Sequence, residues 1–507
     1  MKKDKYLIYT LWVIVATLIF HLIIASSIGL GVDESYTASV SRIFSLGYVD
    51  HPPLHYWMIK LSSLLFDSER PIVLRLPFIL FSAGTTWMMF LITAKLFNAK
   101  SGFFAALVLN LTALFSYMSF GILPDGPLMF FMLSSLYILT KLLFEPDFKN
   151  SAFYWTLFGV FSGLAMLSKY HGVFIFFGLF FFAITSRKWR YLFKSVYPYL
   201  SIIIASILFS VVAIWNIQHN FASFIFQGSR GIPNSFTLTP LNFIINIAGQ
   251  IGYILPWIWL PLAYLLIKGL KKGPDNKSLK IVSHQDITWF LCCFAVWPIL
   301  LFTLPSLWGC KGLPHWQFPG YLMLFPLLGN WIETKTKIRR KLINWVLAFS
   351  IAVIVFAWTF IVTQVKFDWI SRINPVLFAR KDPSHELLDW DDLKVGIDRN
   401  NLIKKYNISF IVTANWILAG RIDYIMGGEI PVLTLPNNQH NFALMHDQTQ
   451  FKGKNALIIL PEDKLNDISR YNFYFKTTTA LKPIAIFQNH ANTLKLNLFL
   501  AENYKGY

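Results

Sequence analysis

The chain has 507 residues, of which 55% are hydrophobic, 17% aromatic and only 14% charged. Soluble domains carry about 25% charged residues, so this composition excludes an ordinary soluble protein and indicates a multi-pass membrane protein. The formal net charge is +19. Such a charge suggests nucleic-acid binding in a soluble protein, but in a membrane protein Lys and Arg gather in cytoplasmic loops near anionic headgroups. We therefore expect membrane lipids, and no nucleic acid, as partners.

The first apolar segment follows a basic N-terminus and resembles a signal peptide. Its apolar part is longer than the roughly 7–15 residues of a signal-peptide core, so we interpret it as an uncleaved first span. A span needs about 20 mainly apolar residues. By this criterion we predict an α-helical membrane protein with eleven transmembrane helices, and thirteen as the upper limit. The predicted spans are residues 6–30, 71–95, 102–120, 127–144, 154–168, 172–186, 195–214, 244–267, 287–304, 316–333 and 342–364.

Lys and Arg are distributed unevenly between the loops that join these spans. They concentrate at the N-terminus and in alternate loops, such as RKWRYLFK at 187–194 and KTKIRRK at 335–341. The loop at 31–70 and the other loops on its side hold few. The positive-inside rule then places the N-terminus in the cytoplasm and loop 31–70 on the opposite face. An odd number of spans puts the C-terminus on that opposite face as well.

The composition changes after about Lys366, where short β-rich runs alternate with helical pattern. This segment of about 140 residues is long enough for a hydrophobic core of its own. We therefore predict a transmembrane domain over residues 1–365 and a small α/β domain over residues 366–507. We expect a helix at 415–427 and strands at 407–414, 430–435, 455–461, 483–488 and 493–500. The α/β segment has no glycine-rich phosphate loop, so nucleotide binding is not supported.

Acidic and histidine side chains cluster in the predicted loop 31–70. Asp33 and Glu34 follow directly on the first span. The other members of the cluster are Asp50, His51 and His55. Carboxylates at the edge of a membrane are costly to place and mark functional sites. This loop is therefore the first candidate site.

Further polar residues lie at the ends of spans on the same predicted face. They are Asp125, Lys169, Tyr170, His171, His219, Arg230, Lys311 and His315. Some have a simpler explanation, because the Pro-Asp-Gly-Pro sequence around Asp125 is typical of a turn and Lys169 can extend to the membrane interface. A lone histidine is also more often an interfacial polar group than a ligand. Their placement together at one face nevertheless indicates a catalytic pocket at the membrane surface.

The chemistry that fits this pattern is the transfer of a sugar from a polyprenyl phosphate. Such a reaction needs a base to take a proton from the acceptor hydroxyl, and a carboxylate serves this purpose. It also needs positive charge or a metal ion on the leaving phosphate. Basic side chains near the headgroup supply that charge. Alternatively, the acidic groups and histidine hold a divalent ion, with Asp50, His51 and Glu34 as the candidate ligands.

Six motifs in the membrane region carry a resemblance to a known family. They are DESY at 33–36, DHPPLHYW at 50–57, LPDGPLMFF at 123–131, GLAMLSKYHGVF at 163–174, WNIQHNFASFIFQ at 215–227 and HWQFPGYL at 315–322. In type and order they resemble the polyprenyl-phosphate-sugar glycosyltransferases of the GT-C architecture. The most similar group is bacterial family 39, which includes the aminoarabinose lipid A transferases and is related to protein O-mannosyltransferases. Residues 366–507 also look like the external domain of that family.

The resemblance implies roles for individual residues. Asp33 would be the base that activates the acceptor, and Glu34 and Asp125 would shape the pocket, orient the sugar or hold a metal. An acidic–basic pair of the family appears here as Asp50-His51, where histidine replaces a permanent cation, so phosphate binding shifts to other basic residues. The predicted substrate-binding set is Asp50, His51, His55, Lys169, Tyr170, His171, His219, Arg230, Lys311 and His315.

We therefore expect a bacterial inner-membrane enzyme that moves one sugar from an undecaprenyl-phosphate-type donor to a periplasmic acceptor. By family analogy the favoured acceptor is lipid A or lipopolysaccharide core, and a protein hydroxyl is the alternative. A transporter or flippase is the rival class, and it predicts polar groups near the bilayer midplane and often internal repeats. We find no repeat, and the polar residues sit at span ends. A third hypothesis, a membrane anchor that presents a binding module, leaves the acidic loop unexplained.

Overall fold

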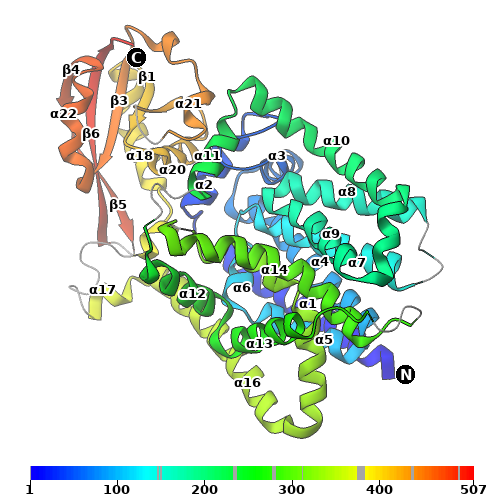
Figure 1. The fold of residues 1–507 in the computed structure, drawn as a ribbon. Helices are drawn as coiled ribbons and strands as arrows, with labels where there is room; N and C mark the ends of the chain where they lie inside the picture. The colour runs from blue at the N-terminus through cyan, green and yellow to red at the C-terminus, as the bar shows by residue number, and fades with distance from the viewer. Residues whose placement is uncertain are drawn as a thin grey trace. The chain divides into compact units, whose positions relative to one another are not determined.

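The computed structural model describes residues 2–145, 148, 151–231, 237–276, 281–310, 312–373, 383–435, 439–488 and 491–506 (Figure 1). The chain divides into two compact units. Unit 1 comprises Met1–Leu22, Leu46–His55 and Leu76–Phe356, and unit 2 comprises Ile23–Ser45, Tyr56–Arg75 and Ala357–Tyr507. Unit 2 therefore combines parts of the predicted loop 31–70 with the C-terminal region. The domain boundary at residues 365 and 366 stays a prediction.

The described part of unit 1 is helical. Its elements, some of which continue into unit 2, are α1 (Lys2–Ala25), α4 (Pro71–Leu96), α5 (Ala99–Asn110), α6 (Ala113–Met118), α7 (Asp125–Phe144), α8 (Ala152–Ser168), η2 (Tyr170–Val173), α9 (Phe174–Thr185), η3 (Arg187–Lys194), α10 (Val196–Gln218), α11 (Ala222–Gly231), α12 (Pro240–Ile254), α13 (Pro256–Lys272), α14 (His284–Thr303), η4 (Leu304–Trp308), α15 (Phe318–Leu322) and α16 (Phe325–Phe367).

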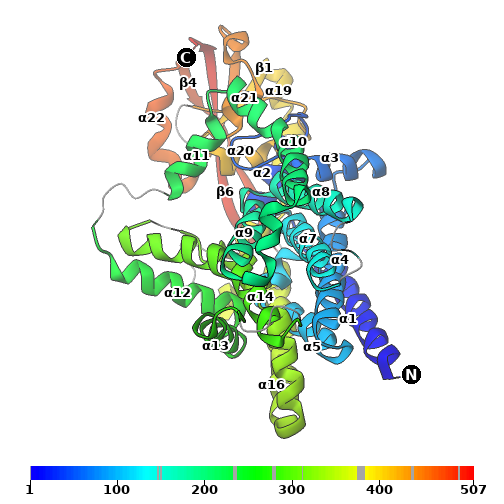
Figure 2. The same ribbon diagram turned by 45° about the vertical axis from the view of Figure 1, so that its right-hand side comes forward.

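Small residues bring neighbouring helices of unit 1 close together. A Cβ atom on Gly159 of α8 would lie 2.7 Å from the backbone oxygen of Ser201 in α10. The Ser201 hydroxyl donates to the carbonyl oxygen of Trp155 at 2.7 Å. In a membrane, where lipid tails are as apolar as the core, such close backbone packing holds helices together. Helices α8 and α10 consequently lie side by side (Figure 2).

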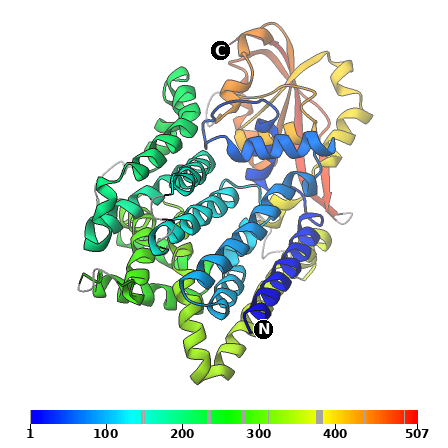
Figure 3. The ribbon, with the colours of Figure 1, turned by 90° about the vertical axis from the view of Figure 1, so that its right-hand side faces the viewer.

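Six helices among the described residues are long and apolar enough to cross a membrane. They are Lys5–Ala25, Pro71–Leu96, Asp125–Phe144, Val196–Gln218, His284–Trp308 and Ile338–Phe367. Two pairs of helices bent by 118° and 112° would raise the number to eight. Figure 3 shows the helices between residues 71 and 144 (blue to cyan) running side by side. A Cβ atom on Gly84 of α4 would lie 2.6 Å from the Phe130 ring of α7. The predicted class of multi-pass helical protein is confirmed, with fewer long helices than the predicted eleven.

Backbone breaks inside apolar runs explain part of the difference. The predicted span 102–120 is divided where Thr112 caps α6 by accepting from the backbone N–H of Phe115 at 3.3 Å. The predicted span 244–267 breaks at Leu255, which has a φ of +74° before Pro256. Hydropathy averaged over about 19 residues does not detect such breaks.

Unit 2 contains a mixed six-stranded sheet. The strands are β1 (Ile408–Thr413), β2 (Val432–Thr434), β3 (Asn455–Pro461), β4 (Phe475–Ala480), β5 (Ile484–Gln488) and β6 (Ala491–Tyr504). The order is β2-β1-β3-β6-β4, with β5 also paired to β6. Strands β1, β2 and β3 are parallel, whereas β6 is antiparallel to β3, β4 and β5. The sheet core is formed by side chains such as Phe410, Ile458 and Phe475, all completely buried.

The predicted α/β character of residues 366–507 is confirmed. All five predicted strands and the predicted helix are present, the helix as α20 (Trp416–Ile425). Strand β4, with the sequence FKTTTA, was missed because most of its side chains are exposed and it lacks an apolar run. The remaining elements of unit 2 are α2 (Val32–Ser41), α3 (Leu54–Phe66, whose first two residues belong to unit 1), α17 (Trp369–Ile373), η5 (Pro383–Leu387), α18 (Asp391–Arg399), α19 (Leu402–Lys405), α21 (Phe442–Met445), η6 (Gln448–Phe451), η7 (Glu462–Asp467) and α22 (Ile468–Tyr471).

Candidate active site

The first turn of α2 in unit 2 carries two adjacent carboxylates with opposite environments. Asp33 is exposed, whereas Glu34 is only 1% exposed. The backbone N–H of Gly31 donates to Oε2 of Glu34 at 2.8 Å, which satisfies one of the donors that a helix start leaves without a partner. Negative charge in this first turn also interacts favourably with the helix dipole. Glu34 therefore closes the start of the helix, while Asp33 is accessible to a substrate.

Arg75 balances the charge of Glu34, and the sequence interpretation missed it. Its side chain is completely buried, and its Nε and Nη2 atoms donate to the two carboxylate oxygens of Glu34 at 2.8 and 2.5 Å. The other hydrogen bonds, of 2.9, 3.0 and 2.7 Å, go to the carbonyl oxygens of Ala25, Ile28 and Gly29. A guanidinium has five N–H hydrogens, and each one therefore has an acceptor. The sequence signal was a lone arginine in the predicted span 71–95, because an ionisable residue in such a segment needs a partner.

The predicted metal ligands do not fit a divalent ion in this structure. The Glu34 carboxylate is committed to Arg75 and to the backbone N–H of Gly31. Among the residues that the structure describes, no three His, Cys, Asp or Glu side chains are grouped closely enough to hold a metal ion. The sequence placed these ligands together because two of them are adjacent and the third lies in the same loop.

In unit 1 an ion pair joins α7 to the segment that follows α8. The Nζ atom of Lys169 lies 2.9 Å from each carboxylate oxygen of Asp125, and both side chains are 5% exposed. Asp125 is the first residue of α7 and follows the N-cap Pro124, so it begins a helix instead of lying in the predicted turn. The mutual attraction of a buried pair offsets the cost of desolvating both charges. Lys169 is thus a neutralised cation.

A cavity of about 370 Å³ lies beside this pair in unit 1, within the roughly 300–1,000 Å³ usual for small-molecule sites. It is lined by His51, Lys169, Tyr170, His171, Val173, Phe174, Phe224, Gln227, Gly228, Arg230, Gly231, Phe302 and Trp316. The ring of His171 stacks on Phe302 with centroids 4.4 Å apart. Among the described residues, Nδ1 of His51 and Nε2 of His171 have no hydrogen-bond partner. Buried polar atoms are normally hydrogen-bonded. A polar ligand in the cavity would supply the partners that these two nitrogen atoms lack.

Arg230 of α11 supplies the positive charge of the cavity wall. Its guanidinium lies over the ring of Trp316, 5.2 Å from the centroid, and over Phe226 at 5.5 Å. Within the described part of the chain it forms no ion pair with an acidic side chain. An arginine held on aromatic faces keeps its planar donors directed and its charge available. Of the two described cations that line the cavity, Arg230 and not the ion-paired Lys169 keeps its charge available for an anionic ligand.

The structure brings together some predicted substrate-binding residues and not others. His51, Lys169, Tyr170, His171 and Arg230 line the cavity. Four further residues do not line it, namely Asp50, His55, His219 and His315. His219 instead stacks on Trp215 at 4.2 Å and bonds the Trp215 carbonyl oxygen through Nδ1 at 2.8 Å, which ties it to the end of its own helix. Lys311 lies outside the described residues.

Several of these residues nonetheless border the cavity-lining groups. The Asp50 carbonyl oxygen accepts a hydrogen bond from the Gln227 side chain, which lines the cavity. His55 is buried, and its ring centroid lies 5.7 Å from that of His51. The Tyr170 hydroxyl is 2.7 Å from that of Ser223. Gln227 and Trp316 were quoted in the sequence motifs but not singled out, because neither titrates.

The histidines of unit 1 predict an acid-sensitive fold. Burial, together with the charge of Lys169, lowers the pKa of His315 to about 4, whereas an unfolded histidine titrates near about 6.5. Protonation of His315 then favours the unfolded chain. The stability that neutral His315 contributes is therefore complete above pH 6.5 and is lost as the pH falls toward 4. Unfolding midpoints measured between pH 7 and pH 4 should fall, and His315→Gln should fall less steeply than the wild type. Parallel pH profiles for the two proteins would contradict this assignment.

The site region matches a known family profile. Residues 50–215, which include His51, Asp125 and Lys169, match the family described as "Dolichyl-phosphate-mannose-protein mannosyltransferase". This match supports a membrane glycosyltransferase, as the motifs indicated.

Two solved structures share the fold over almost the whole chain, and both are of ArnT from Cupriavidus metallidurans. The apo structure is 13% identical with a TM-score of 0.64, and covers 98% of this chain and 98% of ArnT. The structure bound to undecaprenyl phosphate is 14% identical with a TM-score of 0.65, and covers 97% of each chain. At this identity the likeness establishes the fold. No curated protein sequence is a significant match.

Proposed function

We propose that the chain transfers a single sugar from a polyprenyl-phosphate donor to an acceptor on the periplasmic side of a bacterial inner membrane. The cavity of unit 1 carries this proposal, because it combines aromatic walls with an arginine and imidazole nitrogens that, among the residues the structure describes, have no acidic partner and no hydrogen-bond partner respectively. The arginine suits a phosphate, and the imidazoles and aromatic faces suit the hydroxyls and ring of a sugar. The ArnT structure bound to undecaprenyl phosphate, which has the same fold, supports a donor of this class.

In this proposal the reaction is a direct displacement. The acceptor hydroxyl oxygen attacks the anomeric carbon, its proton passes to the Asp33 carboxylate, and the bond from that carbon to the phosphate oxygen breaks. The polyprenyl phosphate leaves with the bonding electron pair, and Arg230 stabilises its developing charge. The configuration at the anomeric carbon is inverted, and no covalent enzyme intermediate forms.

The acceptor in this proposal is lipid A or lipopolysaccharide core. It is supported by the fold shared with ArnT along nearly the entire chain. A protein hydroxyl is the second candidate, favoured by the description of the family that matches residues 50–215. Either acceptor would be reached with the N-terminus in the cytoplasm and the C-terminal region in the periplasm, as the distribution of Lys and Arg predicts.

Turnover by the purified chain tests the proposal. The protein is reconstituted in liposomes with radiolabelled undecaprenyl-phosphate sugars and offered lipid A, lipopolysaccharide core or serine- and threonine-containing peptides. We expect label to move to lipid A or core. Movement of label to peptide would replace the favoured acceptor by the second candidate. Donor crossing the bilayer without any transfer would overturn the glycosyltransferase proposal in favour of a transporter.

Arg230→Gln should weaken donor binding. A hydrogen bond to a charged group contributes about 1.5–3 kcal/mol, so we expect the Kd for undecaprenyl phosphate to rise by about 10- to 100-fold. The matched control is Arg190→Gln, because Arg190 is an exposed arginine of η3 that does not line the cavity. Titration of both variants with undecaprenyl phosphate checks this expectation. Equal affinities in the two variants would remove Arg230 from the phosphate site.

A further inference from the structure

Helix α2, which carries Asp33, packs against α20 in the interior of unit 2 with almost no space between their backbones. Gly420 of α20 faces Tyr36 of α2, and a Cβ atom at position 420 would lie 2.6 Å from the Tyr36 Cα atom. That contact is with backbone, so no side-chain rotation can relieve it. The close packing of α2 on α20 therefore requires a glycine at position 420.

Polar contacts fix α2 along the same face. The Ser39 hydroxyl donates to the Gly420 carbonyl oxygen at 2.9 Å, and both residues are buried. The Tyr36 hydroxyl accepts hydrogen bonds from the backbone N–H and the side-chain amide of Asn441, at 3.1 and 3.0 Å. The Tyr36 ring meets Trp416 edge-on with centroids 4.9 Å apart. These bonds define both the distance and the rotation of α2.

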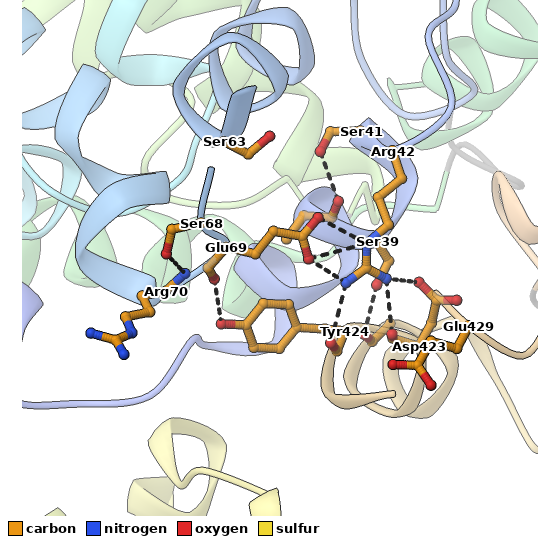
Figure 4. Close-up of polar contacts among 12 residues, drawn as sticks. Ser39, Ser41, Arg42, Ser63, Ser68, Glu69, Arg70, Asp423, Tyr424 and Glu429 are labelled. Atoms are coloured by element: carbon orange, nitrogen blue, oxygen red, sulfur yellow. Dashed lines mark hydrogen bonds and ion pairs between the residues drawn. The ribbon is translucent and has the colours of Figure 1, made fainter. Parts of the chain in front are cut away.

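An arginine anchors the C-terminal end of α2, as Figure 4 shows. Arg42 Nη1 donates to Oδ2 of Asp423 at 2.6 Å, and its Nη2 donates to Oε2 of Glu69 at 2.5 Å and to the Tyr424 carbonyl oxygen at 3.2 Å. The Tyr424 hydroxyl in turn donates to the Glu69 carbonyl oxygen at 2.9 Å. Burial opposes the charge on Arg42, but its bonds to Glu69 and Asp423 outweigh burial and raise the pKa of Arg42. The guanidinium is thus a permanent link between α2 and α20.

We propose that α20 is a positioning element for catalysis, which sets where α2 holds Asp33 through Gly420, Ser39 and the Arg42–Asp423 pair. This inference rests on the proposed function, in which Asp33 is the base. Helix α2 has ten residues, fewer than the about 12–15 that an isolated helix needs to be even marginally stable in water. Its position must therefore come from tertiary contacts. Arg75 holds its first turn through Glu34, and α20 holds the remainder.

Gly420→Ala separates positioning from simple stability. The new Cβ must move from 2.6 Å to an ordinary contact of at least 3.4 Å, which displaces α2 by roughly 1 Å, and a misplacement of that size costs about 100-fold in rate. We expect kcat to fall by about 100-fold while KM for the donor changes less than about twofold, because the donor cavity lies in unit 1. The matched control is Gly252→Ala in α12, where a Cβ atom meets nothing within 4 Å, and whose kcat should match the wild type.

Hydrogen exchange of residues 32–41 gives a readout that does not depend on the reaction. Exchange there should be faster in Gly420→Ala and unchanged in Gly252→Ala. Wild-type kcat together with faster exchange would overturn the positioning role, and so would unchanged exchange. If Gly420→Ala does not bind donor, Ser39→Ala decides instead, with an expected fall in kcat of about fivefold for the loss of one hydrogen bond. Absence of transfer by the wild type would contradict the proposed function alone, since exchange still reports the docking of α2.

Discussion

Asp33→Asn is expected to abolish sugar transfer while the chain stays folded and binds its donor. Asparagine has nearly the same shape as aspartate but cannot take the proton of the acceptor hydroxyl. Loss of a general base lowers a rate by about 10²–10⁴-fold. Asp33 is exposed in the first turn of α2, whereas the adjacent Glu34 is buried and bonds the backbone N–H of Gly31. The substitution should therefore remove the general base and leave the fold intact.

The assay for this variant needs a control from the same unit. Asp398→Asn is a suitable control, because Asp398 is an exposed carboxylate on α18. It loses the same single negative charge as Asp33→Asn. We expect wild-type transfer by Asp398→Asn, and donor affinity within about twofold of the wild type in both variants. Full transfer by Asp33→Asn would exclude the base assignment. Transfer rates of both variants over a range of pH would show whether the residual activity depends on hydroxide, as expected when a base is missing.

The sequence predicted the fold where one local pattern decides the structure. Apolar runs identified the helical membrane class, and β-rich runs identified five of the six strands in unit 2. Strand β4 was missed because it lies on an edge of the sheet with largely exposed side chains, so no apolar pattern marks it. The breaks at Thr112 and Leu255 were missed because a cap and a positive φ concern one residue each, which an average over a span conceals.

The sequence predicted which types of residue form the candidate site, but it did not predict which of them contact one another. The ion pair between Asp125 and Lys169 forms because two particular helices pack together. The spacing of residues along the chain does not indicate which helices do so. The same is true of α2 and α20, which meet across 381 residues of sequence between Ser39 and Gly420. Glu34 illustrates the consequence. The family resemblance implied a pocket role for it, whereas its contacts with Arg75 and Gly31 give it a structural role at the start of α2.

Arg75→Met should be the most destabilising of the substitutions considered. It removes the side chain that forms an ion pair with Glu34, and leaves a carboxylate that is 1% exposed without that pair. Breaking one partner of a buried pair costs about 3–5 kcal/mol. Three carbonyl oxygens around residues 25–29 also lose their donor, so the connection between α1 and α2 loosens. We expect a lower apparent free energy of unfolding in detergent, measured by denaturant titration.

Two further variants show whether the lost ion pair is the cause. Arg70→Met, five residues earlier, removes an exposed arginine and should change stability by less than about 0.5 kcal/mol. Glu34→Gln combined with Arg75→Met removes both charges, and should recover part of the loss because no buried carboxylate remains unpaired. If the double variant were as unstable as Arg75→Met alone, the carbonyl contacts of Arg75 and not its charge would hold this part of unit 2. A stability of Arg75→Met equal to that of Arg70→Met would contradict the structural role of the pair altogether.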